Sequence, residues 1–362
     1  MLPLNGIRVL DLASLLPGPF CSMILADLGA EVIKVERPPG GDPARNFGGL
    51  FDAVNRNKKS ITLDLKKRED REAFARMLEN SDVLLEGFRP GVLAGLGFGM
   101  ADVQAINDKV IYCSISGYGQ DGPYYKLPGH DINYLAVAGV LSISGDPEGK
   151  PAAWGGVQIA DLCSAMYAAL AILAALRHRD LCGKGAYLDV SMADCVLAWM
   201  GPRIGEYYGR GKPAKRIFMG RGGYGVYKTG DGKYLAIGCV EPHFWQNLCK
   251  ALELPDMAGE DKYIQWYGRM EFHKEINSVL AERFLEKNRE AWLDLLAKAD
   301  VPCSPVNSIN ELMHDPHLVS RNLFRSIRGM PVVRFPVQFD GIEVREVGPG
   351  PKLGEHNEEI PK

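Results

Sequence analysis

The stretch IRVLDLASLLPGPFCSMILADLGAEVIKVE, residues 7–36, contains two short strand-like runs separated by one helical run. IRVLDLA and EVIKVE are typical of buried strands, and PFCSMILADLGA between them is typical of a helix closed by a glycine. Because a helix between two strands returns the chain to the starting edge of a sheet, the two strands are expected to be parallel. The stretch therefore predicts an α/β fold.

The same alternation continues along the chain. Residues 60–65 (SITLDL), 82–88 (DVLLEGF) and 110–116 (VIYCSIS) predict further strands, with a charged helix from about 66 to 80. A long apolar helix is expected from about 157 to 179, followed by a turn rich in glycine and lysine over 182–194. We expect a Rossmann-like, doubly wound parallel sheet.

The domain organisation is predicted from shifts in composition. The large Rossmann-like domain is expected over residues 1–200, and the segment 201–225, rich in Gly, Arg and Lys, reads as a linker. A smaller α+β domain follows over 226–305, with a hairpin whose turn is Gly230–Gly232. Residues 306–362 are predicted to return and pack on the large domain.

Composition restricts the class of protein. A chain of 362 residues with net charge −3 gives no reason to expect binding to nucleic acid or to a membrane surface. Its eight cysteines lack CxxC or Cys/His spacing, which favours reduced core thiols in a cytoplasmic protein, and no metal site is predicted. The most apolar run, 162–176, is too short to span a bilayer.

Charged residues near the strand ends suggest a phosphate-bearing ligand. Glu36 ends the second strand, as in a nicotinamide site, but the preceding loop SLLPGPFCSM lacks the glycines of GxGxxG. Basic groups on or beside these loops could hold several phosphates, and a solvated basic face is the alternative. They are Arg37, Arg56, Lys58, Lys59 and Lys66.

Three residues are candidates for acid–base chemistry. Asp131 is expected to cap a helix over about 132–144, so that His130 lies just outside the N-terminus of this helix. The positive end of the helix disfavours imidazolium and keeps His130 neutral, able to act as a base. The alternative is a loop histidine that bonds a backbone carbonyl. Asp161 interrupts an apolar helix near its start, where it is either a catalytic carboxylate or a cap. Glu241 follows a hairpin strand, where an ordinary exposed acid is equally expected.

Several long motifs resemble one family. LPGPFCSMILADLGAEVIKVERP, NRNKKSITLDLK, EGFRPGV, GYGQDGP, GHDINY and EPHFW together are similar to the family III CoA-transferase superfamily, over about residues 4–325, and GHDINY resembles its α-methylacyl-CoA racemase branch. The resemblance implies His130 and Asp161 as the acid–base pair, with Glu241 assisting. It implies an interlocked, ring-like homodimer and no cofactor beyond the CoA of the substrate. The implied CoA-binding residues are Arg37, Leu63, Asp64, Leu65, Lys66, Gly87, Phe88, Arg89, Gly129, Asp131, Ile132, Asn133 and Tyr134.

The main functional hypothesis is a racemase that interconverts (R)- and (S)-2-methylacyl-CoA thioesters. His130 and Asp161 would exchange a proton on opposite faces of an enolate, with backbone N–H groups near Asp131 and Asp161 bonding the enolate oxygen. The alternative is a CoA-transferase in which Asp161 is a covalent nucleophile. Residues 218–226, FMGRGGYGV, differ from the LDGGAP of such racemases and keep this alternative open. A nicotinamide-dependent oxidoreductase is the third hypothesis.

Overall fold

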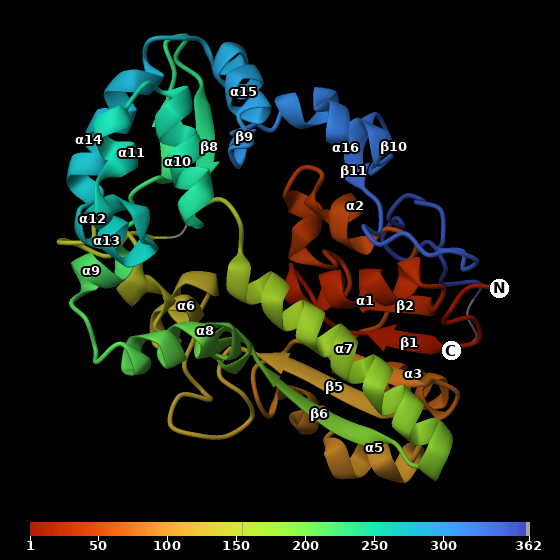
Figure 1. Ribbon diagram of the computed structural model, residues 1–362. Helices are drawn as coiled ribbons and strands as arrows, with labels where there is room; N and C mark the ends of the chain where they lie inside the picture. The colour runs from red at the N-terminus through yellow and green to blue at the C-terminus, as the bar shows by residue number, and fades with distance from the viewer. Residues whose placement is uncertain (154, 360–362) are drawn as a thin grey trace. The chain divides into compact units, whose positions relative to one another are not determined.

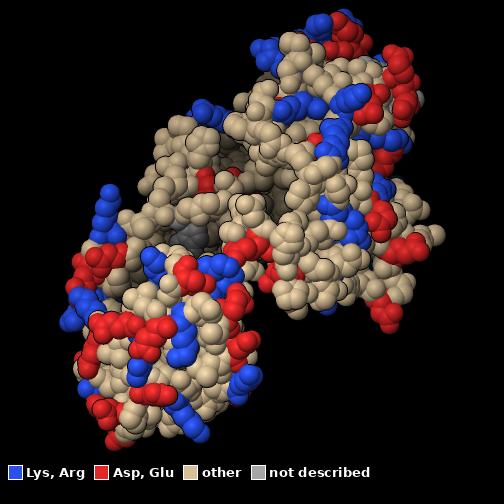
Figure 2. Space-filling model, turned by 90° about the horizontal axis from the view of Figure 1, so that it is seen from above, with Lys and Arg blue, Asp and Glu red and all other residues tan. Residues whose placement is uncertain are grey.

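The computed structural model describes residues 1–153 and 155–359. By internal contacts the chain divides into a first unit (Met1–Ser142, Ala153–Gly201 and Arg321–Lys362) and a second unit (Ile143–Ala152 and Pro202–Ser320). Basic and acidic side chains are interspersed on the face shown in Figure 2, as expected from a net charge near zero.

A parallel sheet is the centre of the first unit. Its strands are β1 (Arg8–Asp11), β2 (Glu31–Glu36), β3 (Lys59–Thr62), β4 (Val83–Glu86), β5 (Ile111–Ser116) and β6 (Ala186–Ser191). They are ordered β3-β2-β1-β4-β5-β6, and every neighbouring pair is parallel. The predicted α/β, doubly wound class is confirmed.

Helices cover both faces of this sheet (Figure 1). The helices are α1 (Pro17–Asp27), α2 (Leu50–Asn55), α3 (Arg68–Glu79), α4 (Val92–Gly95), α5 (Met100–Ile106), α6 (Asp131–Val137), α7 (Ile159–Cys182) and α8 (Met192–Gly209), with short 3₁₀ turns at Pro43–Asn46 and Val140–Ile143. One apolar core packs α1, α6 and α7 on the sheet, and a second packs α3 and α5 on the opposite face. This two-sided burial explains why the strands read as continuous apolar runs.

Helix α7 is long and apolar enough to cross a membrane by length and composition alone. Half of its most apolar stretch is buried inside the first unit, where it packs on α1, α6 and the sheet. It ends where Gly183 adopts a left-handed conformation, at φ 75°. These contacts are those of a core helix.

Two local predictions are wrong. Residues 186–191, predicted as part of a turn, form β6, which pairs with β5 along its whole length. The flanking glycines favour a turn, although AYLDVS alternates as a strand does. The helix expected over 132–144 is the shorter α6; its N-cap is His130 rather than Asp131, and the left-handed Gly139 (φ 82°) follows its end.

The second unit contains an antiparallel sheet and a helical layer. Strands β7 (Tyr224–Lys228), β8 (Tyr234–Gly238) and β9 (Cys303–Pro305) are ordered β7-β8-β9, and the hairpin predicted around Gly230–Gly232 is confirmed. The helices are α9 (Lys215–Met219), α10 (Pro242–Ala251), α11 (Pro255–Gly259), α12 (Asp261–Ile264), α13 (Trp266–Glu271), α14 (His273–Phe284), α15 (Arg289–Lys298) and α16 (Pro316–Ser320), with a 3₁₀ turn at Glu311–His314. Helix α9 and the end of α8 lie within the predicted linker.

The end of the chain returns to the sheet of the first unit. After the hairpin of β10 (Phe324–Ile327) and β11 (Met330–Val333), residues 345–359 form a segment that we call the C-terminal strap. His356 N–H donates to the Ser60 carbonyl at 2.9 Å, and the Thr62 N–H donates to the Asn357 side chain at 3.0 Å. The strap thereby occupies hydrogen-bonding groups of β3, which is otherwise an edge strand.

Candidate active site

The strand order locates the most favourable place for a ligand. The chain winds outward from β1 to β3 and then returns to β4 on the other side of β1. In such sheets, ligands bind beyond the carboxyl ends of the strands where the order reverses. Cavities of about 260 Å³ and 560 Å³ lie at this edge, and Ser14 after β1 and Phe88 after β4 line both.

The smaller cavity lies beyond the ends of β2 and β3, and we call it the β2–β3 cavity. Its lining includes Arg37 and the whole segment Leu63–Lys66. The structure thus brings together five of the residues that the resemblance implied for CoA, along with Phe88. Arg37 and Lys66 are cations that could bond phosphate oxygens there.

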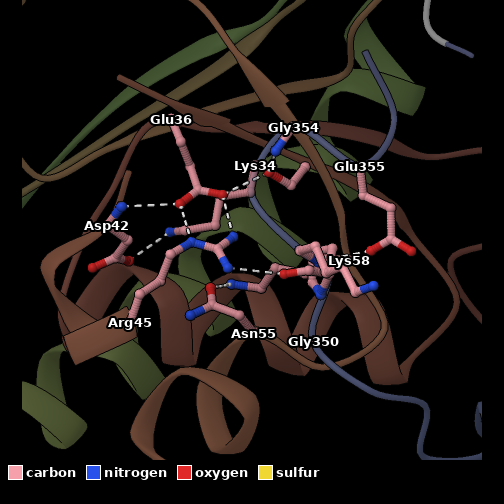
Figure 3. Close-up of polar contacts among 12 residues, drawn as sticks. Lys34, Glu36, Asp42, Arg45, Asn55, Lys58, Gly350, Gly354 and Glu355 are labelled. Atoms are coloured by element: carbon pink, nitrogen blue, oxygen red, sulfur yellow. Dashed lines mark hydrogen bonds and ion pairs between the residues drawn. The ribbon is translucent and has the colours of Figure 1, made fainter. Parts of the chain in front are cut away.

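A buried polar network forms the wall of the β2–β3 cavity (Figure 3). Lys34 Nζ lies 2.8 Å from the Asp42 carboxylate and donates to the Ala13 carbonyl at 2.8 Å. Asp42 also accepts from the Leu15 N–H at 3.0 Å. These bonds fix the loop after β1, which lines both cavities.

Glu36, at the end of β2, is already occupied by protein partners. Arg45 donates to it at 2.6 and 2.8 Å, Ser60 at 2.6 Å and the Asp42 N–H at 2.9 Å. Burial raises the pKa of Glu36, but these hydrogen bonds outweigh burial and hold it below its usual range. Its oxygens have no capacity left for a ribose, which removes the main argument for a nicotinamide site.

The predicted basic cluster divides into two groups. Three of its members are paired with carboxylates away from the cavity lining: Arg56 with Asp27 at 2.6 Å, Lys58 with Asp11 at 3.1 Å and Lys59 with Glu31 at 2.8 Å. Arg56 and Lys58 are buried, and burial lowers the pKa of Lys58 to about 8. The cluster prediction is therefore wrong for these three, because charges at strand ends also form ion pairs within the protein.

The larger cavity, which we call the β4–β5 cavity, lies beyond the ends of β4 and β5. It brings His130 and Asp161 together with six predicted CoA-binding residues: Gly87, Phe88, Arg89, Gly129, Asn133 and Tyr134. Asp131 and Ile132 are not part of its lining. Glu241 lies in the second unit, as the exposed N-cap of α10.

Asp161 is the chemically unusual group of this cavity. It lies half-buried in the first turn of α7. Burial, and secondly the negative charge of Asp131, raise the pKa of Asp161 to about 6, with His130 acting weakly in the opposite direction. A carboxylate with this pKa is ionised at neutral pH but poorly solvated.

Asp131 has a different role from the predicted one. Its carboxylate accepts from the N–H groups of Ala160 at 2.6 Å and Asp161 at 3.3 Å, so it caps α7 and not its own helix. These two N–H groups are therefore not available to an enolate oxygen, as the racemase hypothesis required. His130 is exposed, and its backbone N–H donates to the Asn133 side chain at 3.0 Å.

Sequence reasoning missed several residues of the β4–β5 cavity. Leu15 after β1, Gly117 after β5, Tyr125, Leu127 and Met192 all line it. A Cβ atom on Gly117 would lie 2.5 Å from the Tyr134 ring, so only glycine fits there. The glycine of GYGQDGP was the available signal, because it directly follows a strand. In the described part of the chain, no three His, Cys, Asp or Glu side chains gather as a metal site would require.

Comparisons with known proteins show the family of the chain. The family model of CoA-transferase family III matches residues 4–357. The chain is 35% identical to acetyl-CoA:oxalate CoA-transferase of Acetobacter aceti, covering 99% of this chain and 95% of the relative. It is 35% identical to human succinyl-CoA:glutarate CoA-transferase, covering 99% and 85%. The crystal structure of a CAIB/BAIF family protein from Brucella suis superposes with TM-score 0.87 at 32% identity, covering 98% and 97%.

The prediction of a racemase, and hence of an isomerase, is wrong. These relatives are named CoA-transferases, which favours the alternative reading of the sequence. Both hypotheses give Asp161 a role, so this residue did not separate them. The prediction depended on the histidine of GHDINY, and a histidine in this loop does not by itself require proton transfer.

Proposed function

The chain belongs to CoA-transferase family III, and on this basis we propose that it moves CoA from an acyl-CoA thioester to a carboxylic acid, with Asp161 as the covalent nucleophile. The observation that carries the proposal is the Asp161 carboxylate, half-buried in the wall of the β4–β5 cavity with a pKa raised to about 6. Among the described residues, no hydrogen bond or ion pair to its carboxylate oxygens is found. Its lone pairs are therefore available for attack.

The proposed reaction has two halves. An Asp161 oxygen attacks the thioester carbonyl and expels CoA thiolate, which leaves an acyl-aspartyl anhydride. The thiolate then attacks the aspartyl carbonyl, so that the first acid leaves and an Asp161–CoA thioester remains. A second carboxylate repeats the sequence in reverse and leaves as its CoA thioester. Over the full cycle one thioester bond is broken and one thioester bond is formed, so neither water nor a redox partner is consumed.

The two cavities offer places for the two ends of CoA. Arg37 and Lys66 in the β2–β3 cavity would bond its phosphates. Phe88 lines both cavities, so the pantetheine arm would pass it to bring the thioester to Asp161. Glu241 stays a prediction, and so does the homodimer, which size-exclusion chromatography with light scattering would test.

We propose small dicarboxylic acids as the acceptors. The relatives named above act on oxalate and glutarate by their names. Arg89 and His130 line the same cavity as Asp161, and a guanidinium and an imidazole there could bond the carboxylate that does not react. His130 is thus assigned to acceptor binding, with no proton transfer at carbon.

A trapping experiment tests the proposal. The protein is incubated with succinyl-CoA or acetyl-CoA, and intact mass spectrometry looks for a CoA adduct that hydroxylamine converts to an Asp161 hydroxamate. CoA transfer to oxalate, malate or glutarate is measured in parallel. We expect Asp161→Ala to abolish both adduct and transfer, and His130→Ala to form the adduct but use the acceptor poorly. Transfer at the wild-type rate by Asp161→Ala would overturn the proposal.

A further inference from the structure

The GYGQDGP motif, residues 117–123, has no role in the reaction as described, yet its backbone begins at the wall of the β4–β5 cavity. Gly117 lines that cavity, and so does the segment Gly87–Pro90 after β4. Buried groups beneath these two loops hydrogen-bond to them.

Glu86, the last residue of β4, lies directly beneath them and is only 4% exposed. One of its carboxylate oxygens accepts from the Phe88 N–H at 2.7 Å. The other accepts a short hydrogen bond from the hydroxyl of Ser114, its register partner on β5. Glu86 thus holds the backbone of Phe88, whose side chain lines both cavities.

The network continues from Ser114 into the GYGQDGP motif. The Gln120 side-chain amide donates to the Ser114 hydroxyl at 2.8 Å, and the Gln120 N–H donates to Asp189 on β6 at 3.0 Å. A continuous series of hydrogen bonds therefore joins the loop after β4 to the loop after β5. Glu86, itself the last residue of β4, bonds both Ser114 of β5 and the Phe88 backbone.

No cation neutralises Glu86 among the described groups that act on it. The titratable side chains coupled to its charge are Tyr112 and Cys113 of β5 and Tyr187 and Asp189 of β6. Burial raises the pKa of Glu86 to about 7, with a smaller contribution from Asp189, against the hydrogen bonds from Ser114 and the Phe88 N–H. Its charge therefore changes within the physiological range of pH.

We propose that Glu86 is a positioning residue that sets the affinity for CoA, because its ionised carboxylate holds the Phe88 loop and, through Ser114, the GYGQDGP motif in the binding arrangement. This rests on the proposed function, since it concerns the same CoA site. A hydrogen bond to a charged acceptor is about fivefold stronger, as an equilibrium constant, than one to a neutral acceptor. CoA should therefore bind about fivefold more tightly above the titration of Glu86 than below it.

Calorimetric titration with free CoA between pH 6.0 and 8.5 tests this, because free CoA carries no acyl group to react. Glu86→Gln keeps the acceptor for the Phe88 N–H and cannot ionise. The ratio of its Kd to that of the wild type should be near 1 at pH 6.0 and about fivefold at pH 8.5. Titration of the CoA phosphates cancels in this ratio.

Two further variants separate positioning from a purely structural role. Ser114→Ala removes a donor that lowers the pKa of Glu86, so the pH midpoint of CoA binding should move upward. Glu79→Gln, at the exposed end of α3, should leave Kd unchanged at every pH. A ratio that does not vary with pH, or an unmoved midpoint in Ser114→Ala, would overturn the inference. Wild-type protein that binds no CoA at any pH would instead overturn the proposed function.

Discussion

The charge of Asp131 should control the pH at which Asp161 becomes reactive. Because the pKa of Asp161 is about 6, roughly one tenth of the molecules carry the nucleophilic carboxylate at pH 5 and almost all do at pH 8. Formation of the CoA adduct at saturating donor should therefore fall about tenfold from pH 8 to pH 5. The loss occurs as pH falls, since only the ionised form attacks.

Asp131→Asn removes the second cause of this raised pKa and keeps an oxygen to accept the N–H groups of Ala160 and Asp161. We expect the pKa of Asp161 to fall by up to about one unit, so that about half is ionised at pH 5. Adduct formation at pH 5 should then be about fivefold faster than in the wild type and similar at pH 8.

Rapid-quench mass spectrometry of the first half-reaction gives these rates directly. Glu79→Gln is the control, because it removes one negative charge from the exposed end of α3 without being among the groups that act on Asp161. In this control, the rate of adduct formation should fall between pH 8 and pH 5 as it does in the wild type. If the rate of adduct formation falls with decreasing pH in the same way in Asp131→Asn and in the wild type, the electrostatic account of Asp161 is refuted.

Two stability predictions follow. Because the pKa of the Glu86 carboxyl is raised in the folded state, it contributes stability at low pH that is lost as pH rises from 4.5 to about 7. Glu86→Gln should therefore raise the free energy of unfolding, relative to the wild type, by about 2 to 3 kcal/mol more at pH 8 than at pH 5. Urea melts that show the same change at both pH values would contradict this. Arg56→Ala should lower the free energy of unfolding by about 3 to 5 kcal/mol, because it leaves Asp27 buried and unpaired, while CoA affinity is kept. Arg37→Ala should weaken CoA binding about tenfold or more in titrations and change the free energy of unfolding little. Loss of CoA affinity in Arg56→Ala, with affinity kept in Arg37→Ala, would show that Arg56 and not Arg37 binds CoA.

The parallel sheet could be predicted because its strands are buried on both faces and so form short apolar runs that periodicity detects. Strand β6 could not be recognised in the same way, since AYLDVS is short and lies between a glycine-rich turn and a helix. The end of α6 was placed too late because the apolar pattern continues past Gly139, whose left-handed backbone terminates the helix.

The site could be predicted only for residues that belong to a recognisable sequence motif. GHDINY and the start of α7 correctly placed His130 and Asp161 in one cavity. The partner of a charged side chain is not visible in the sequence, so neither the phosphate-binding hypothesis nor the solvated-face alternative anticipates that Arg56 and Lys58 neutralise Asp27 and Asp11. The cap formed by Asp131 was missed for the same reason, because it joins residues 29 positions apart.

The C-terminal strap has a consequence for biosynthesis. Strand β3 leaves the ribosome early, but the groups that cover its edge, such as His356 and Asn357, are translated almost 300 residues later. Contacts of such large sequence separation form slowly, and an uncovered edge strand is a template for association with other chains. The edge of β3 is therefore uncovered until residues 356 and 357 have been translated, and during that period the nascent protein should depend most on chaperones.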